Sequence, residues 1–321
     1  MIHVGLGGYF ELEIPDRGGF LHDDGVLLNS GRNALEYVLR SLPDVRHLWI
    51  PYYTCEVILE PIKKLDLSFS FYQIDERLEI QDSVELKTGD YLLYTNYFGI
   101  KDHYVRQLAD RFGMHLIVDN AQAWYADSIS GTSTVFSPRK YVGIPDGGIA
   151  FCSTGITIEK FEQDSSYDRC SHLLKRIDLG PSAGYQDYRQ NSRALVDQPI
   201  KRMSKLTERL LKSIDFDAIK QKRKKNYMYL ETRLRTDNML CLPDSSSFEC
   251  PMVYPFLTKE YSLKERLIQN KVFVATYWPN VLEWDRQSGF ETRLAHDLVC
   301  LPIDQRYGES EMEEIVNLIR R

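Results

Sequence analysis

A lysine at position 140 lies in a segment rich in proline and glycine, which could hold its amine in a fixed direction. The segment reads Phe136-Ser137-Pro138-Arg139-Lys140 and precedes an apolar run at 148–152. An amine held in this way can attack a carbonyl carbon as a nucleophile. Most lysines are solvated surface residues, so Lys140 is informative only in combination with other residues of matching chemistry.

A carboxylate and a side-chain amide follow another apolar run, at 115–119. Asp119 ends this run and Gln122 stands three residues later. A carboxylate at the end of a buried strand could pair with a cationic ring nitrogen, and the amide could reach a ring hydroxyl group. Two other interpretations remain open, namely an aspartate that caps the next loop and a magnesium ligand.

A turn of small residues, Asn29-Ser30-Gly31-Arg32-Asn33-Ala34, opens a segment with helical spacing. Free N–H groups and the positive end of the helix dipole make such a turn suitable for a phosphate. The hydroxyl of Ser137, three residues before Lys140, could add a hydrogen bond to the same phosphate. An ordinary helix start with a serine cap is the alternative interpretation.

Together these residues predict pyridoxal 5′-phosphate (PLP) as the cofactor. The protonated pyridine ring of PLP is the better electron sink, so the cofactor needs an anionic partner at its ring nitrogen. Asp119 would be that partner, and Lys140 would form the Schiff base.

The elements that must position these residues alternate in type along the first half of the chain. Apolar runs at 47–51, 67–74, 90–95, 115–119 and 148–152 predict strands, and 34–42, 54–65 (with Thr54 as cap) and 102–112 predict helices. This alternation predicts an α/β fold with a mostly parallel sheet, in which ligands bind at the carboxyl ends of the strands.

The second half of the chain has a different pattern. It predicts helices at 201–211 and 217–234, strands at 249–257 and 272–276, and a last helix from Ser310. We therefore expect an N-terminal arm (1–25), a large PLP-binding domain (26–212) and a smaller α+β domain (213–321). The segment 170–198 has no clear assignment.

Composition excludes several classes of function. The 321 residues carry a net charge of −6, so no basic excess favours nucleic acid. No apolar stretch reaches the roughly 18 residues of a membrane span. The six cysteines form no Cys-x-x-Cys pair and the histidines show no ligand spacing, so we expect no metal site. The plain interpretation is a cytoplasmic enzyme.

The chain resembles the fold-type I PLP enzymes, specifically the DegT–StrS family of sugar aminotransferases. The matching segments, in chain order, are Ser30-Gly31-Arg32-Asn33-Ala34-Leu35, Pro51-Tyr52-Tyr53-Thr54-Cys55, Asn96-Tyr97-Phe98-Gly99, Asp119-Asn120-Ala121-Gln122-Ala123, Lys140 with Asp146-Gly147-Gly148, Arg202-Met203-Ser204, Tyr277-Trp278-Pro279 and Val299-Cys300-Leu301-Pro302-Ile303. Several are loose individually, but their order along nearly the whole chain is specific.

This resemblance implies an aspartate aminotransferase-like fold with a seven-stranded sheet. It also implies a homodimer with the active site at the subunit interface, and transfer of an amino group, usually from glutamate, to a keto sugar carried on a nucleotide. The residues that it places around the cofactor are Gly31, Arg32, Tyr53, Cys55, Asp119, Gln122, Ser137 and Lys140, and those that it places near the substrate are Asn96, Tyr277 and Trp278.

The chain departs from the family pattern at two positions. Cys55 replaces an aromatic residue that packs near the cofactor ring, a role that Tyr53 or Trp124 could take over. Ile200 replaces an asparagine that reaches the partner's phosphate. These departures leave two alternatives open: a PLP-dependent lyase or dehydratase, and a PLP-binding protein with a regulatory role. Family dehydratases are expected to have histidine instead of lysine, so Lys140 counts against a dehydratase.

Overall fold

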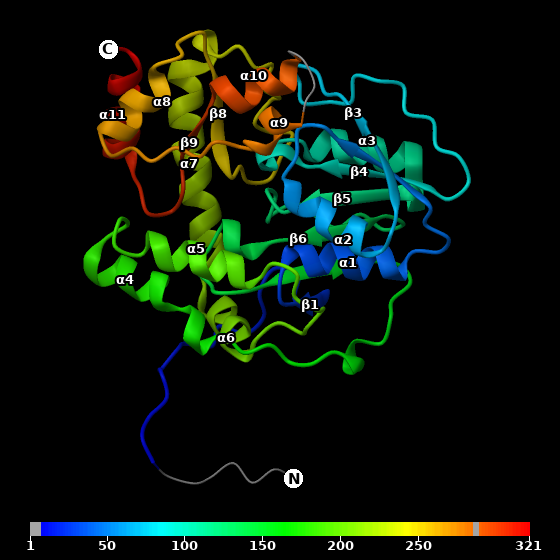
Figure 1. Cartoon of the computed structure of the whole chain (residues 1–321). Helices are drawn as coiled ribbons and strands as arrows, with labels where there is room; N and C mark the ends of the chain where they lie inside the picture. Colours follow the sequence, from blue (N-terminus) through cyan, green and yellow to red (C-terminus); the bar gives the residue numbers. More distant parts are fainter. Residues whose placement is uncertain (1–7, 285–288) are drawn as a thin grey trace.

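The apolar runs in the first half of the chain, together with β1 and β6, form one seven-stranded sheet in the computed structural model, which describes residues 8–284 and 289–321 (Figure 1). The strands stand in the order β1-β7-β6-β5-β4-β2-β3. Their bounds are Val26–Leu28 (β1), His47–Pro51 (β2), Ser68–Tyr72 (β3), Asp90–Thr95 (β4), Leu116–Asn120 (β5), Ser133–Phe136 (β6) and Gly148–Phe151 (β7). Among them β7 alone runs antiparallel to its neighbours. The predicted mixed, mostly parallel sheet is confirmed.

Helices cover both faces of this sheet because alternate strand residues point to opposite sides. On β4, Leu93 belongs to the hydrophobic cluster shared with α1 and α2, whereas Leu92 and Tyr94 belong to the cluster shared with α3. The bounds of these helices are Gly31–Ser41 (α1), Leu59–Lys64 (α2) and Asp102–Phe112 (α3). The α/β layering predicted from the sequence is therefore present.

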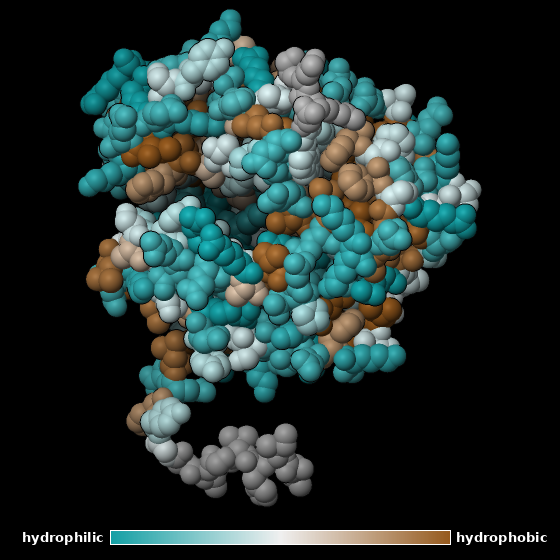
Figure 2. Space-filling view, viewed as in Figure 1, coloured by the Kyte–Doolittle hydropathy of each residue, from teal (hydrophilic) through white to brown (hydrophobic). Residues whose placement is uncertain are grey.

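The second half of the chain adds a two-stranded antiparallel sheet of β8 (Val253–Leu257) and β9 (Leu298–Pro302), surrounded by helices (Figure 1). The helices of this half are Ser171–Leu179 (α4), Tyr185–Ala194 (α5), Lys205–Ser213 (α6), Phe216–Leu234 (α7), Leu263–Gln269 (α8), Asn280–Glu283 (α9), Phe290–Asp297 (α10) and Glu309–Ile319 (α11). Buried side chains on both sides of residue 212 share one cluster, from Tyr97 to Tyr254 and Leu301. The domain boundaries therefore stay a prediction. Figure 2 shows a hollow, lined by hydrophilic side chains, above the position that α5 has in Figure 1.

Several strands differ from the expectation. The run at 272–276 is not a strand: Ala275 makes one isolated bridge to Cys300, and Phe273 is 57% exposed. Val272 and Val274 pack against the core, but the segment makes no ladder of backbone hydrogen bonds. An apolar, β-branched composition therefore wrongly predicted a strand. Strand β8 begins at Val253, four residues later than predicted. Strands β1, β6 and β9 are not among the predicted strands, and the polar start of β6, Ser133-Thr134, hides that strand in the sequence.

Two helices begin at other residues than predicted, and the residues that cap them explain the difference. The helix expected at 201–211 begins at Lys205 because the Ser204 side chain caps it by accepting the Thr207 N–H. The helix expected from Thr54 is split into a 3₁₀ turn, Glu56–Ile58, and α2, so Thr54 is not its cap. The unassigned segment forms α4 and α5, which an ion pair joins between Lys175 and Asp187.

The described part of the expected arm, residues 8–25, contains no helix or strand. Tyr9 is 99% exposed and Phe10 is 91% exposed, so the arm leaves the body of the chain (Figure 1). Residues 1–7 of the expected arm lie outside the described residues.

Candidate active site

Strand β5 places Asp119 at its carboxyl end, in the middle of the sheet. The Oδ1 atom of Asp119 accepts the N–H of Ala121 at 2.9 Å. Burial raises the pKa of the Asp119 carboxyl, while the positive charge of Lys140 and the Ala121 N–H oppose this rise. Asp119 is thus a desolvated carboxylate whose charged form depends on a nearby cation.

Lys140 ends a 3₁₀ turn, Pro138–Lys140, that directly follows the neighbouring strand β6. We call residues 137–147, between β6 and β7, the lysine loop. Because β5 and β6 are parallel, this loop begins at the same end of the strands as the loop that follows Asp119. Burial raises the pKa of the Cys55 thiol, and the charge of Lys140 is the strongest opposing influence. Lys140 therefore lies within electrostatic range of both Asp119 and Cys55, and the structure brings these three predicted residues to one site.

The predicted phosphate turn adjoins the lysine loop. Ser30 caps α1 by accepting the Asn33 N–H at 3.1 Å, and the first turn of α1 contains no acidic residue. A Cβ atom on Gly31 would stand 3.3 Å from the Cβ of Ser137. The helix start and the Ser137 side chain therefore border one small space, which suits an anionic group.

Two glycines hold this turn against the lysine loop. The N–H of Gly147 donates to the carbonyl of Asn29 at 2.9 Å. A Cβ atom on Gly148 would lie 2.1 Å from the carbonyl oxygen of Ser30 and 2.6 Å from the nitrogen of Gly31. Gly148 is required here because the backbone of the phosphate turn occupies the place of a side chain, and Gly147 is favoured because its φ is +123°.

We expect Gly148→Ala to displace residues 30–31 and to weaken cofactor binding. Overpacking of this kind costs about 1–3 kcal/mol of stability, measured by urea unfolding of wild type and variant. Gly143→Ala is the matched control, because its Cβ would meet only the Leu173 Cδ2 at 3.3 Å. Equal stability and equal cofactor affinity of Gly148→Ala and wild type would refute this account of the turn.

Asp146 connects the lysine loop to α6, a role that sequence reasoning missed. It is fully buried and accepts the backbone N–H of Ser204 at 2.9 Å and the Ser204 hydroxyl at 2.7 Å, and the Thr207 hydroxyl also donates to it. The two matching segments Asp146-Gly147-Gly148 and Arg202-Met203-Ser204 are thus one hydrogen-bonded unit. Because the two residues are 58 positions apart in the chain, no local sequence pattern could have shown this contact.

We expect Asp146→Asn to destabilise the protein by about 1.5–3 kcal/mol, the range for hydrogen bonds to a charged group. The new amide would point a donor at groups that already donate. Urea unfolding measures the loss, and Asp168→Asn, an exposed carboxylate nearby, serves as control. An unfolding midpoint of Asp146→Asn equal to that of the control would contradict the prediction.

Gln122 has one amide atom in use and one without a partner. Its Oε1 accepts the N–H of Phe98 at 3.0 Å, and its buried Nε2 has no hydrogen-bond partner. A buried donor without a partner is costly in a folded protein. An acceptor such as a ring hydroxyl oxygen would satisfy it.

The guanidinium of Arg32 is already engaged elsewhere. Its Nη1 donates to the Leu195 carbonyl at 2.9 Å, and its Nε lies 3.3 Å from a carboxylate oxygen of Glu60. The predicted phosphate contact at this position is therefore better supplied by the backbone of the helix start than by the side chain.

The aromatic candidates around Cys55 have their rings in the core. Tyr53 is fully buried, its hydroxyl donates to the Tyr277 carbonyl at 2.5 Å, and its ring contacts Trp278 at 4.8 Å between centroids. Trp124 is also fully buried and packs against Phe136. Cys55 thus lies near Lys140, whereas the ring of Tyr53 is part of the buried core next to the site.

The predicted substrate residues have different surroundings. Asn96 is buried, its amide donates to Asp102 and Asn120, and its Oδ1 accepts the Lys101 N–H. A substrate contact by Asn96 would have to displace one of these bonds. The ring of Tyr277 packs against Phe98, and the ring of Trp278 packs against Tyr53. Phe98 in turn donates its N–H to Gln122, so these aromatic rings lie close to Gln122.

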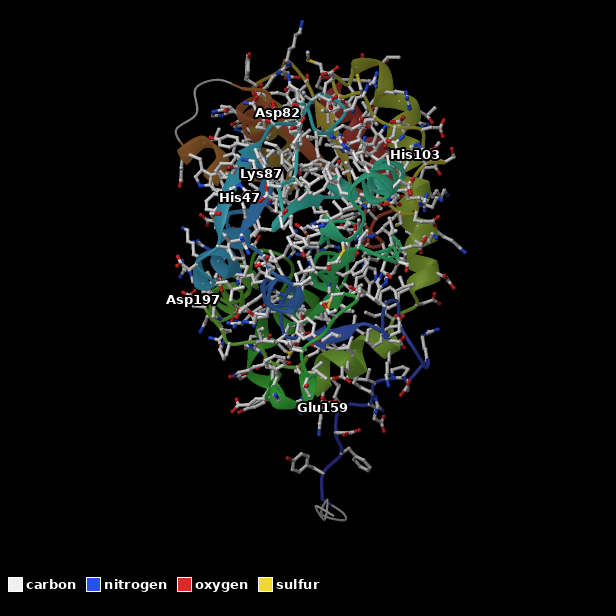
Figure 3. All side chains as sticks on the ribbon, turned by 90° about the vertical axis from the view of Figure 1, so that its right-hand side faces the viewer. His47, Asp82, Lys87, His103, Glu159 and Asp197 are labelled. Atoms are coloured by element: carbon white, nitrogen blue, oxygen red, sulfur yellow. The ribbon has the colours of Figure 1, made fainter. Side chains whose placement is uncertain are left out.

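No group of three or more metal-ligating side chains occurs within residues 8–284 and 289–321. His47 and His103, labelled in Figure 3, come from β2 and α3 and stand apart. Within the same ranges, no helix is long and apolar enough to cross a membrane.

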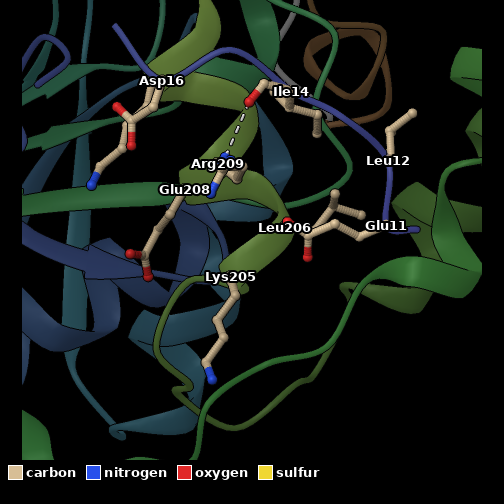
Figure 4. Close-up of a pocket in the computed structure, with 9 residues that line it drawn as sticks. Glu11, Leu12, Ile14, Asp16, Lys205, Leu206, Glu208 and Arg209 are labelled. Carbon is tan, nitrogen blue, oxygen red and sulfur yellow. Dashed lines mark hydrogen bonds between the residues drawn. The ribbon is translucent and has the colours of Figure 1, made fainter. Parts of the chain in front are cut away.

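A pocket between the arm and α6 lies away from these residues. It is lined by Leu12, Ile14, Lys205 and their neighbours, and Arg209 donates to the Ile14 carbonyl at 3.2 Å (Figure 4). None of the predicted site residues lines this pocket. The candidate active site is therefore the group of residues at the carboxyl ends of the central strands.

Comparison with solved structures finds the same fold in several proteins. Similar structures include the sugar aminotransferase CalS13 from Micromonospora echinospora (15% identity, 92% of this chain and 86% of that chain, TM-score 0.62). A DegT DnrJ EryC1 StrS aminotransferase from Brucella abortus is similar over 92% of this chain and 84% of that chain (13% identity, TM-score 0.59). A putative PLP-dependent aminotransferase from Bacillus cereus is similar over 94% of this chain and 88% of that chain (11% identity, TM-score 0.57).

At these identities the similarity establishes the fold, which agrees with the aspartate aminotransferase-like expectation. No family model matches the sequence. No curated protein matches it either.

Proposed function

We propose that this chain is a PLP-dependent aminotransferase that transfers an amino group from glutamate to a keto sugar carried on a nucleotide. The proposal rests on the closeness of Lys140 to Asp119 at the carboxyl ends of the central strands, together with the Gln122 amide nitrogen that has no hydrogen-bond partner. The similar solved structures support the same reading, because those named above include a sugar aminotransferase.

The residues present fit the cofactor. Asp119 would hold the proton on the ring nitrogen, Gln122 Nε2 would donate to the ring hydroxyl oxygen, and the start of α1 with Ser137 would bind the phosphate. When bound, PLP withdraws electrons from the substrate carbon and makes its proton acidic. Lys140 Nζ would hold the cofactor covalently at rest and then carry a proton at the substrate carbon.

The proposal includes a homodimer with the active site at the interface. In the single chain the Lys140 side chain is exposed, although reactive amines are usually shielded from water. Helix α4 also exposes Leu174, Ile177 and Leu179, at 57%, 81% and 69%. Exposed apolar groups of this kind are typical of surfaces that bind another chain. Sedimentation of the purified protein tests the dimer.

The absorption spectrum of the purified protein, before and after addition of L-glutamate, tests the activity. We expect a band near the visible edge that shifts when glutamate is added, after which keto sugars can be screened as acceptors. A band that ignores every amino donor would favour a lyase or a regulatory protein. Absence of bound PLP after reconstitution would refute the proposal.

A further inference from the structure

Arg139, the residue before Lys140, is a half-buried cation without a counter-ion. Its Nη2 lies 3.4 Å from the hydroxyl of Ser192, and its Nε is buried with no hydrogen-bond partner. Within residues 8–284 and 289–321 no carboxylate lies within 4.0 Å of it. Two neighbouring arginines differ, because Arg32 is 3.3 Å from Glu60 and Arg169 is 2.8 Å from Asp164.

The electrostatic surroundings of Arg139 are unfavourable. Burial lowers the pKa of its guanidinium and the charges of Arg32 and Arg169 lower it further, whereas Tyr188 and Asp146 oppose this. A guanidinium remains charged in proteins, so it needs compensation for lost hydration. An anion bound at the free edge of Arg139 would supply that compensation.

Helix α5 forms one wall of the space around Arg139. Ser192 and Tyr188 lie one turn apart on this helix. Burial raises the pKa of the Tyr277 hydroxyl, and Tyr188 adds to this effect, so Tyr188 is near both Arg139 and Tyr277. The hollow in Figure 2 lies above α5, in the region where the lysine loop faces the second half of the chain.

We propose that Arg139, with the hydroxyls of Ser192 and Tyr188, binds the α-carboxylate of the amino donor. This inference rests on the proposed function, since Lys140 is where the donor's amine would react. In an amino acid the amine and the carboxylate share one carbon atom, so the groups that bind them must lie close together, and Arg139 directly precedes Lys140 in the same short turn. The planar guanidinium edge matches the two oxygens of a carboxylate.

Two reagents that react with lysine-bound PLP separate this subsite from the rest of the site. Hydroxylamine carries no carboxylate, and aminooxyacetate carries one. We expect Arg139→Gln to raise the half-saturating concentration of aminooxyacetate by about ten- to a hundred-fold, the worth of a hydrogen bond to a charged group. The response to hydroxylamine should be unchanged. Arg139→Lys should restore part of the affinity, because it keeps the charge without the planar edge.

Arg189→Gln is the matched control, because Arg189 is an exposed arginine on α5 next to Tyr188. It should leave both reagents unaffected. An equal loss for hydroxylamine and aminooxyacetate in Arg139→Gln, or no loss for either, would overturn the inference. Loss of PLP itself in this variant would also overturn it, because the bound anion would then be the cofactor's phosphate.

Calorimetry with glutarate tests the subsite without relying on the reaction. We expect glutarate to bind the purified wild-type protein and to lose this binding in Arg139→Gln. Persistence of glutarate binding in the variant would overturn the assignment, as would binding of inorganic phosphate in its place. If the wild-type protein shows no PLP band, the proposed function fails, while the glutarate titration still decides on Arg139.

Discussion

Replacing Lys140 with alanine is expected to abolish covalent attachment of the cofactor and to reduce amino transfer by about a hundred- to ten-thousand-fold or more. The variant loses both the amine that attacks the cofactor carbonyl and the group that carries the proton at the substrate carbon. Borohydride reduction followed by peptide mass spectrometry measures attachment, and the glutamate-dependent shift of the absorption band measures the first half of the reaction.

Lys160→Ala is the control for this experiment, since Lys160 is an exposed lysine away from the site. Lys140 is also exposed in the single chain, so its removal should lower the urea unfolding midpoint of the cofactor-free protein only slightly, through the lost attraction to Asp119. Recovery of the reduced cofactor on a different lysine of the wild-type chain would remove Lys140 from the mechanism.

Replacing Asp119 with asparagine is expected to lower amino transfer by about a hundred-fold or more while the cofactor still attaches to Lys140. A neutral amide cannot favour the protonated ring nitrogen in the way that a carboxylate does. The rate of the glutamate-dependent spectral change gives the loss, and borohydride trapping shows that attachment persists.

The same substitution should have the opposite effect on stability. Burial raises the pKa of the Asp119 carboxyl in the folded chain, so ionisation of this group at neutral pH disfavours the folded state, and this penalty is absent below the unfolded pKa. Asp119→Asn should therefore unfold at an equal or higher urea concentration at pH 7 without cofactor. Asp110→Asn, an exposed carboxylate on α3, should change neither property. Full activity in Asp119→Asn would contradict the assigned role.

The relation between Asp119 and Lys140 follows from topology, of which the sequence showed one half. Asp119 lies near the end of the predicted strand β5, whereas Lys140 follows β6, which was not predicted, and the carboxyl ends of these parallel strands meet. The phosphate turn was predictable for a similar reason, because small residues before a helix leave N–H groups free. In these cases the backbone places the functional group, and short sequence patterns determine the backbone.

The partners of long side chains were not predictable in this way. Arg32 turns to Leu195 and Glu60, Asn96 bonds Asp102 and Asn120, and the ring of Tyr53 packs in the core. Each of these partners is distant in the sequence or depends on a rotamer that only packing selects. The strand order fixed the position of their backbones but not the direction of their side chains.

The sequence by itself therefore determined the α/β layering, the mostly parallel sheet and the segments that border the candidate site, because strand periodicity, helix starts and tight glycine turns are local properties. The number of seven strands was implied by the family resemblance and not by the periodicity. Only the tertiary structure decided that Asp146 accepts hydrogen bonds from Ser204, the cap of α6, and that Gly148 makes room for the phosphate turn. It alone showed Arg139 without a counter-ion beside α5. These features depend on which distant groups share one desolvated space, and that is set by packing of the whole chain.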